Sequence, residues 1–277
     1  PYRKGREKEM LLCDSFEEWA ENFVKASGLR LFSYDNYTQM NPQGPEEEGI
    51  NCYYENLYMY SKVAKKAGIP FWVTNLSVGH FRYRCPKEDD FRWQLNTSVA
   101  SGAKCILWFF LYMRHTRINY RVAPIDEHWE RSETFEWLSR VQRTFQYNFG
   151  ALMAELTHES TVHCHKAYGG YKLFKENEDP IVKRVESANN TPSILSFFHD
   201  KDGRKYMAIV NNSQTESDYF TYYFDNSVKN IYRIAWGGKE VNARENDVCN
   251  RYSMTDKGSQ NSAWLAPGQM EIFRLEF

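Results

Sequence analysis

The apolar and polar positions of this chain follow two different patterns, which change over near residue 158. Before that point, segments with apolar residues at helical spacing alternate with short runs that are apolar throughout. The predicted helices cover residues 14–28, 54–66, 87–101 and 132–156, and the predicted strands cover residues 29–34, 71–76 and 105–112. Regular alternation of helices with continuously apolar strands predicts a parallel sheet that is covered on both faces.

A doubly wound sheet and a (β/α)8 barrel both fit this alternation. The loops after the strands are long and polar, and no glycine-rich phosphate turn follows any strand, so we favour the barrel. Three strands cannot close an eight-stranded barrel, and we therefore interpret residues 1–157 as the C-terminal part of one. The chain begins without an initiator Met or an apolar signal segment, which favours a processed, trimmed or partial chain.

Beyond residue 158 the apolar runs are short and alternate with polar residues, as in antiparallel strands. These runs cover residues 194–199, 206–211, 219–224, 231–236 and 270–277. Asp202-Gly203 and Gly237-Gly238 are typical of hairpin turns between such strands. We therefore predict that residues 158–277 form a C-terminal antiparallel β-sandwich domain.

Composition narrows the class of partner. The 35 basic and 36 acidic residues leave a net charge of -1, which gives no electrostatic basis for binding nucleic acid. The mean hydropathy is -0.69 and no apolar run approaches twenty residues, so no membrane span is predicted. Aromatic residues make up 16% of the chain. Such rings stack on the C–H faces of sugars, although β-rich proteins also carry many aromatic residues in their cores.

The C-terminal ends of parallel barrel strands are where functional residues gather. Asp35, at the end of the first predicted strand, is the best candidate catalytic carboxylate. The candidate substrate-binding residues are Tyr37, Trp72, Asn75, Ser77, His80, Trp108, Tyr112 and Arg114. The alternatives are structural: Asp35 could cap an Asx-turn, and Asn75 and Ser77 could hydrogen-bond to nearby backbone. His80 could simply be exposed in its loop.

Other motifs give weaker signals. His163-Cys164-His165 resembles a metal site, but no third ligand stands at a recognisable spacing, so we favour a structural role and predict no metal. The six cysteines form no C-x-x-C pair, and no Walker or G-x-G-x-x-G motif occurs, so no cofactor is predicted. Trp236 and Trp264 could belong to a glycan-binding face of the sandwich, but core packing is the favoured interpretation.

Three segments carry a resemblance to a known group of enzymes. "LRLFSYDNYTQ", "YYENLYMYSKVAKKAGIPFWVTNLSVGH" and "FRWQLNTSVASGAKCILWFFLYM" resemble the last three strand units of bacterial glycoside-hydrolase barrels related to the β-galactosidases. The ending "WLAPGQMEIFRLEF" is similar to the closing strand of the sandwich in the same proteins. The resemblance implies an extracytoplasmic protein, periplasmic or secreted, that acts on carbohydrate.

The resemblance also implies retaining hydrolysis by two carboxyl groups, with an acid/base that would lie upstream of residue 1. The segment "PFWVTNLS" carries Asn75 and Ser77 where that family has a nucleophilic glutamate. Asp35 is then the remaining carboxylate, as nucleophile, base or hydroxyl-binding group. Two hypotheses follow: a glycoside hydrolase that acts on an oligo- or polysaccharide, or a non-catalytic glycan-binding protein on a glycosidase scaffold. A metal hydrolase that uses His163 and His165 is a weaker third.

Overall fold

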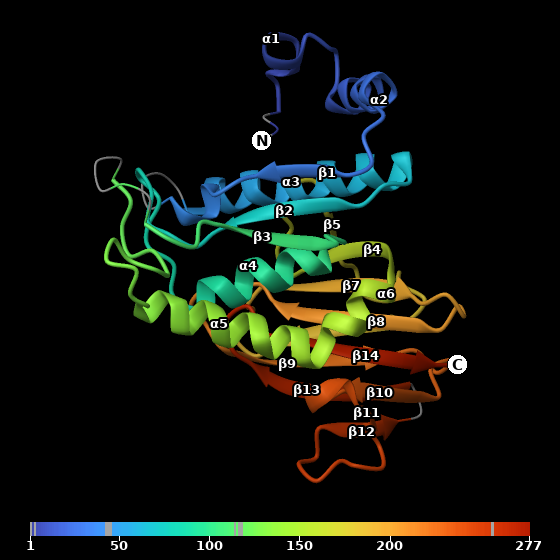
Figure 1. The fold of residues 1–277 in the computed structure, drawn as a ribbon. Coiled ribbons are helices and arrows are strands. Elements are labelled where there is room, and N and C mark those ends of the chain that lie inside the picture. The colour runs from blue at the N-terminus through green and yellow to red at the C-terminus, as the bar shows by residue number, and fades with distance from the viewer. Residues whose placement is uncertain (1, 3, 42–45, 114, 116–118, 256–257) are drawn as a thin grey trace. The chain divides into compact units, whose positions relative to one another are not determined.

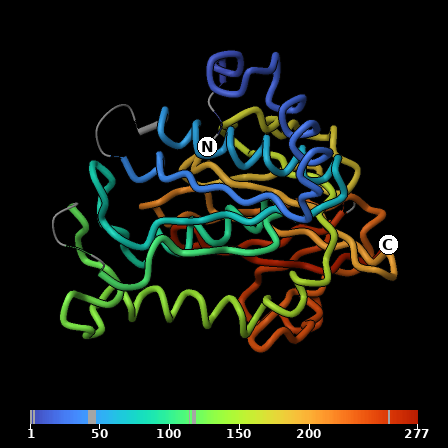
Figure 2. Tube along the Cα trace, turned by 45° about the horizontal axis from the view of Figure 1, so that its top comes forward, coloured from blue at the N-terminus to red at the C-terminus, as the bar shows by residue number. Residues whose placement is uncertain are grey.

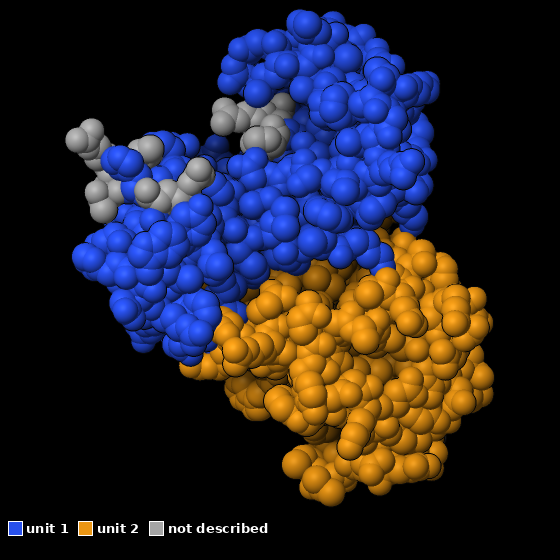
Figure 3. Space-filling model, in the orientation of Figure 1, with its two compact units in different colours: residues 1–88, 101–138, 168–171 blue, residues 89–100, 139–167, 172–277 orange. Residues whose placement is uncertain are grey.

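The structure is a computed structural model, which describes residues 2, 4–41, 46–113, 115, 119–255 and 258–277. Its contacts divide the chain into two compact units, coloured separately in Figure 3. Unit 1 comprises residues 1–88, 101–138 and 168–171, and unit 2 comprises residues 89–100, 139–167 and 172–277. Among the described residues, no helix is both long enough and apolar enough to cross a membrane.

Unit 1 begins with two helices, α1 (Glu7–Leu11) and α2 (Phe16–Ser27). The Ser15 hydroxyl caps α2 by accepting a hydrogen bond from the Glu18 backbone N–H at 3.1 Å. Gly28 ends the helix in the left-handed conformation, with φ of 63°. The Ser15 and Gly28 signals therefore mark the observed ends of the helix predicted over residues 14–28.

The centre of unit 1 is a parallel sheet of three strands in the order β1-β2-β3 (Figure 1). The strands are β1 (Phe32–Asp35), β2 (Phe71–Leu76) and β3 (Cys105–Phe109). Helix α3 (Glu46–Ala67) links β1 to β2 and runs along this sheet (Figure 2). Because the strand order follows the chain without reversal, this sheet contains no switch point of the kind that holds ligands in doubly wound folds.

The two faces of this sheet differ. On one face Tyr34 stacks on Tyr60 of α3, with ring centroids 4.0 Å apart, so this face is covered by the helix. Strand register places Asp35 beside Thr74 and Leu107 on the opposite face. Asp35 and Leu107 are exposed there, and Ser33 two residues before Asp35 is exposed too. The sheet is thus closed toward α3 and open on the face that carries Asp35.

Helix α3 begins earlier than the sequence pattern predicts. Between β1 and the helix predicted over residues 54–66 lie a short 3-10 helix, η1 (Thr38–Met40), and the first residues of α3, which begins at Glu46. The acidic run at residues 46–48 therefore lies in the first turn of a helix. Residues 42–45, which include two prolines, lie outside the described residues.

Unit 2 contains two sheets. The larger has seven strands in the order β11-β10-β14-β8-β7-β4-β5, and the smaller has four in the order β12-β13-β9-β6. The bounds are β4 (Thr157–Cys164), β5 (Lys172–Leu173), β6 (Val182–Ser187), β7 (Ser193–His199), β8 (Lys205–Asn211), β9 (Asp218–Phe224), β10 (Asn230–Ile234), β11 (Glu240–Asn242), β12 (Tyr252–Thr255), β13 (Gly258–Leu265) and β14 (Met270–Glu276).

The two sheets share one apolar core. Alternate residues of β7 and β14, such as Phe197 and Phe273, meet Phe220 and Tyr222 of β9 in a single buried cluster. The two predicted hairpin turns are confirmed: Gly203 lies between the antiparallel pair β7 and β8, and Gly237-Gly238 lies between β10 and β11. Each of these glycines has a positive φ, which is the conformation such turns require.

Helical segments complete unit 2. Residues 89–100 of α4 (Glu88–Ala100) belong to it because Trp93 donates to Asn212 at 3.0 Å and Asn96 donates to the Gly268 carbonyl at 2.8 Å. The helix predicted over residues 132–156 is divided into α5 (Glu133–Phe145), a π-helical turn (Gln146–Gly150) and α6 (Ala151–Glu155), of which residues 139–155 belong to unit 2. The compact units therefore alternate along the chain, and the domain boundary expected near residue 158 stays a prediction.

Candidate functional site

Asp35 is the last residue of β1 and is exposed on the open face of the unit 1 sheet. Tyr37 follows it two residues later and is buried. Burial raises the pKa of the Tyr37 hydroxyl, and the nearby Asp35 charge raises it further, so the phenol stays protonated. An exposed carboxylate and a buried, neutral phenol therefore lie near each other at the C-terminal end of the strand.

Trp72 shares the open face with Asp35. Register places Trp72 between Ser33 and Cys105, one side-chain layer before the layer formed by Asp35, Thr74 and Leu107. Its side chain is half-buried. The predicted binding role of Trp72 stays a prediction, in a position on the same face as the candidate carboxylate.

Asn75 and Trp108 lie on the other face. They are register partners and alternate with residues of the open face, so they share the α3 side of the sheet with Tyr34. Asn75 is fully buried. The sequence interpretation placed both residues with Asp35 because it counted every residue near a strand end. Their roles in binding stay predictions.

Ser77 is also fully buried just after β2. Its hydroxyl donates to the Phe110 carbonyl at 2.9 Å, and its backbone N–H donates to the Phe109 carbonyl at 2.8 Å. The observed contacts of Ser77 therefore join the end of β2 to the end of β3. A role of Ser77 in binding sugar stays a prediction.

His80 lies among aromatic rings in the loop after β2. Its ring stacks on Tyr120 at 4.7 Å between centroids and contacts Phe109 at 5.5 Å. Its Nδ1 atom is buried and has no hydrogen-bond partner among the described residues. Burial and the neighbouring Arg121 charge both lower the pKa of the imidazole. His80 is therefore a neutral ring within an aromatic cluster near the strand ends.

Arg121 fixes this loop to the one that follows β3. Its guanidinium donates to the Tyr83 carbonyl at 2.7 Å and to the Phe81 carbonyl at 3.3 Å. Its backbone forms two hydrogen bonds with Gly79, at 2.8 and 2.9 Å. A Cβ at Gly79 would stand 2.6 Å from the Cys85 sulfur, so glycine allows this close approach without displacing that side chain. The two loops are held together at this point.

Beneath these loops, an apolar cluster closes the C-terminal ends of the strands. Its buried members come from all three strand ends and the loops after them: Tyr37, Met40, Leu76, Val78, Phe110 and Ala123. Tyr37 stacks on Phe109 with centroids 5.6 Å apart, which links the β1 end to the β3 end. The rim of the sheet is therefore a packed structure that can hold exposed side chains in fixed positions.

Two exposed aromatic rings belong to the segment that follows β3. Tyr112 and Trp129 stack in parallel, with centroids 5.6 Å apart and an interplanar angle of 19°. Their side chains are 43% and 74% exposed. Sequence reasoning selected Tyr112 but missed Trp129. The signal that could have found it was a tryptophan isolated within the polar run "IDEHWERS" after a barrel-type strand.

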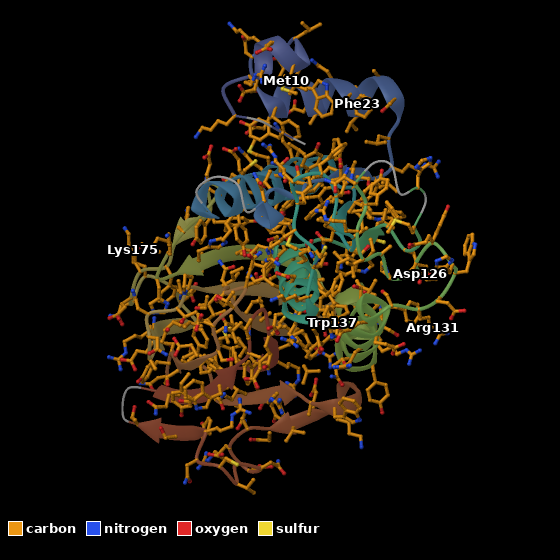
Figure 4. The ribbon with its side chains drawn as sticks, turned by 90° about the vertical axis from the view of Figure 1, so that its left-hand side faces the viewer. Met10, Phe23, Asp126, Arg131, Trp137 and Lys175 are labelled. Atoms are coloured by element: carbon orange, nitrogen blue, oxygen red, sulfur yellow. The ribbon has the colours of Figure 1, made fainter. Side chains whose placement is uncertain are left out.

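Asp126 shapes the loop that presents Trp129. Its carboxylate accepts backbone hydrogen bonds from His128 at 2.8 Å and Glu130 at 2.9 Å, which lower its pKa. Figure 4 shows Asp126 and Arg131 on this loop. Trp129 itself has a positive φ of 65°, a strained conformation for a tryptophan that the loop hydrogen bonds maintain.

Two further predictions concern Arg114 and the histidine pair. Arg114 lies outside the described residues. His163 and Cys164 are buried at the end of β4, and His165 follows the strand with a positive φ of 66°. Within the described ranges, no group of three or more His, Cys, Asp or Glu side chains is placed to hold a metal ion. The metal-hydrolase hypothesis therefore has no ligand set in the described part of the chain.

Chemically, the described rim offers a carboxylate and a flat apolar surface. Asp35 can accept hydrogen bonds from hydroxyl groups or act as a base or nucleophile. The Tyr112–Trp129 pair offers aromatic faces together with a phenol and an indole N–H at their edges. This combination suits a ligand that has both C–H faces and hydroxyl groups.

No protein-family model and no curated protein matches this chain. Solved structures that share a partial likeness include the GH51 arabinofuranosidase from Xanthomonas axonopodis pv. citri, with a TM-score of 0.41 and 9% identity over 95% of this chain and 56% of that one. The GH27 β-L-arabinopyranosidase from Geobacillus stearothermophilus has a TM-score of 0.35 and 10% identity over 94% and 60%. The Thermotoga maritima α-L-fucosynthase has a TM-score of 0.35 and 11% identity over 95% and 56%. The chain thus spans little more than half the length of these enzymes.

Proposed function

We propose that this protein acts on an oligo- or polysaccharide at the C-terminal edge of the unit 1 sheet, as a glycoside hydrolase. One observation carries the proposal: Asp35 ends β1, and Tyr112, three residues after β3, stacks on Trp129, and all three side chains are exposed. Because β1 and β3 both run parallel to β2, Asp35 and Tyr112 follow from the same edge of the sheet. A carboxylate and exposed aromatic rings at one sheet edge are a combination that suits sugars.

Within this proposal, residues 1–157 form the later part of a (β/α)8 barrel and residues 158–277 form a β-sandwich. The open face of the sheet supports the barrel. Parallel sheets are normally covered on both faces, yet Leu107 is exposed opposite α3 and the half-buried Cys105 lies beside it. In a complete (β/α)8 barrel such a face lies inside the barrel, and the edges of β1 and β3 are paired with neighbouring strands.

Asp35 is the proposed catalytic carboxylate, as nucleophile or base. Its position at the end of β1 leaves it accessible, and the buried Tyr37 phenol lies close enough to feel its charge. Tyr112 and Trp129 are proposed to hold a sugar ring by stacking, and Trp72 extends the same open face. The extracytoplasmic location and the bacterial origin belong to this proposal too, and both rest on the sequence resemblance alone.

Hydrolysis of aryl glycosides tests the catalytic assignment. We expect Asp35→Ala to lower the turnover number by at least about 100-fold, the usual scale for removing a catalytic acid or base. Ser33→Ala is the matched control, because Ser33 is exposed on the same face of the same strand. Retention of full activity in Asp35→Ala would exclude Asp35 from catalysis.

A second candidate function is glycan binding without hydrolysis. The end of β2 favours it, because Asn75 and Ser77 stand there in place of a carboxylate and both are fully buried. This hypothesis predicts heat of binding in calorimetry with oligosaccharides and no product in any hydrolysis assay. Detection of reducing sugar that depends on Asp35 would rule it out.

A further inference from the structure

The outer face of the four-stranded sheet in unit 2 carries a second pair of exposed aromatic rings. Trp264 of β13 and Tyr219 of β9 are register partners, with ring centroids 5.6 Å apart. Their side chains are 65% and 37% exposed, whereas their chain neighbours Ala263 and Leu265 point into the core. The sequence-based preference for core packing of Trp264 is therefore wrong, because strand alternation turns this ring outward.

Polar side chains continue this face along the same strands. Thr221 and Ser262, the next register pair on this side of β9 and β13, are buried, and their hydroxyls form a hydrogen bond of 2.8 Å with each other. Tyr223 comes next on β9, with the Arg184 guanidinium 4.1 Å from its ring centroid. From Tyr219 to Tyr223 the strand advances four residues, or about 13 Å at ~3.3 Å per residue. The two tyrosines are thus further apart than the width of a single sugar ring.

The charges on this face cancel. Arg184 pairs with Glu186 at 3.2 Å, and the Tyr223 hydroxyl donates to the same carboxylate at 2.7 Å. The two charged side chains that project from β6 on this face therefore neutralise each other. An anionic chain would gain no net attraction here, whereas an uncharged ligand with hydroxyl groups can exchange hydrogen bonds with both side chains.

We propose that this face binds an extended, uncharged polysaccharide chain, with Trp264 and Tyr219 as the stacking platform. The proposal rests on carbohydrate as the ligand class of the protein, but it assigns a separate surface on unit 2. Both rings project from strands in the middle of a sheet, so they are presented without a loop rearrangement. Stacking on sugar C–H faces, together with the phenol groups of Tyr219 and Tyr223 and the Arg184–Glu186 pair, then provides recognition.

Affinity electrophoresis of the full chain tests this proposal. The gels contain a soluble neutral polymer (arabinoxylan, galactan or hydroxyethylcellulose), with polygalacturonate as the charged comparison. We expect retardation by at least one neutral polymer and none by polygalacturonate. Trp264→Ala is expected to weaken binding about tenfold, which is the scale of one lost aromatic contact. Trp264→Phe, which keeps a ring, should restore most of it.

Trp236→Ala is the matched control. Trp236 is a tryptophan of unit 2 with 68% exposure, but it pairs with Tyr147 away from the four-stranded sheet. Equal retardation of Trp264→Ala and the unmutated chain, or no retardation by any neutral polymer, would overturn the proposal. So would a Trp264-dependent dimer in sedimentation without polysaccharide binding, because the face would then be a protein interface.

The same assay separates this proposal from the rim function. If Asp35→Ala and Trp129→Ala lose activity or monosaccharide binding but keep polymer binding, the two surfaces act independently as proposed. If polymer binding is lost in Trp129→Ala and kept in Trp264→Ala, the rim alone binds glycan and the second surface is refuted. If only Trp264→Ala has an effect and no glycoside is cleaved, the hydrolase function fails and this surface stands.

Discussion

Gly268 provides a test of how unit 2 is built. It lies in the turn between β13 and β14 with φ of 65°, and its carbonyl accepts a hydrogen bond from Asn96 of α4. A Cβ at this position would stand 2.3 Å from the Trp93 Cα and 2.4 Å from the Trp93 backbone nitrogen. No side-chain rotation relieves an overlap with backbone, so Gly268→Ala must displace α4 or the turn.

The expected magnitude follows from two costs. An alanine in the left-handed region costs about 1–2 kcal/mol, and overpacking adds typically about 1–3 kcal/mol. We therefore expect Gly268→Ala to lower the free energy of unfolding of unit 2 by about 2–5 kcal/mol. Gly203→Ala is the matched control, because Gly203 also has a positive φ, in the β7–β8 turn, but a Cβ there would meet nothing within 4 Å.

Urea denaturation followed by tryptophan fluorescence measures both variants, and hydrogen exchange of residues 89–100 locates the effect. Gly203→Ala should show only the conformational cost, and Gly268→Ala should in addition increase exchange in α4. If Gly268→Ala is no less stable than Gly203→Ala, the assignment of α4 to unit 2 is refuted.

Two further outcomes are expected for the core of unit 2. Burial lowers the pKa of His163 from 6.5 to about 3, so between these pH values the unfolded chain binds a proton that the folded chain does not. The free energy of unfolding should therefore fall as the pH drops from 6.5 toward 3, by up to ~1.4 kcal/mol per pH unit. This pH dependence should be shallower in His163→Gln, and an equal slope in both chains would contradict the assignment. Buried Glu271 accepts hydrogen bonds from Arg233 at 2.9 Å and Arg251 at 2.8 Å. Glu271→Ala should lower the free energy of unfolding in urea by about 3 kcal/mol, because both arginines lose their partner. The arginines remain partly solvated, which keeps this cost at the lower end of the range for a broken buried ion pair. Glu186→Ala, which breaks an exposed pair, should cost less than about 1 kcal/mol, and a larger loss there than at Glu271 would contradict this account.

Most secondary structure of unit 1 could be predicted because local signals agree with tertiary packing. Ser15 and Gly28 bound α2, and the apolar runs became β1, β2 and β3. The start of α3 could not be predicted, because an acidic run with two prolines is typical of loops as well as of helix N-termini. The packing of α4 in unit 2 could not be predicted either, since it depends on long-range contacts of Trp93 and Asn96.

The candidate site shows a different limit. Strand-end position alone selected Asn75 and Trp108 together with Asp35, although alternation along a strand sends them to opposite faces. The same alternation, applied to Ala263-Trp264-Leu265, would have predicted an outward Trp264. Trp129 could be found only by asking why a loop of polar residues holds a tryptophan, because its stacking on Tyr112 joins residues 17 positions apart in the sequence.

The most direct test of whether the rim recognises carbohydrate is calorimetric titration with a panel of neutral mono- and oligosaccharides. The titration compares the unmutated chain with Trp129→Ala. The account predicts heat of binding for at least one sugar in the unmutated chain and about tenfold weaker binding in Trp129→Ala, because the stacked pair with Tyr112 is lost. Equal affinity in both chains, or no heat with any sugar, would contradict it.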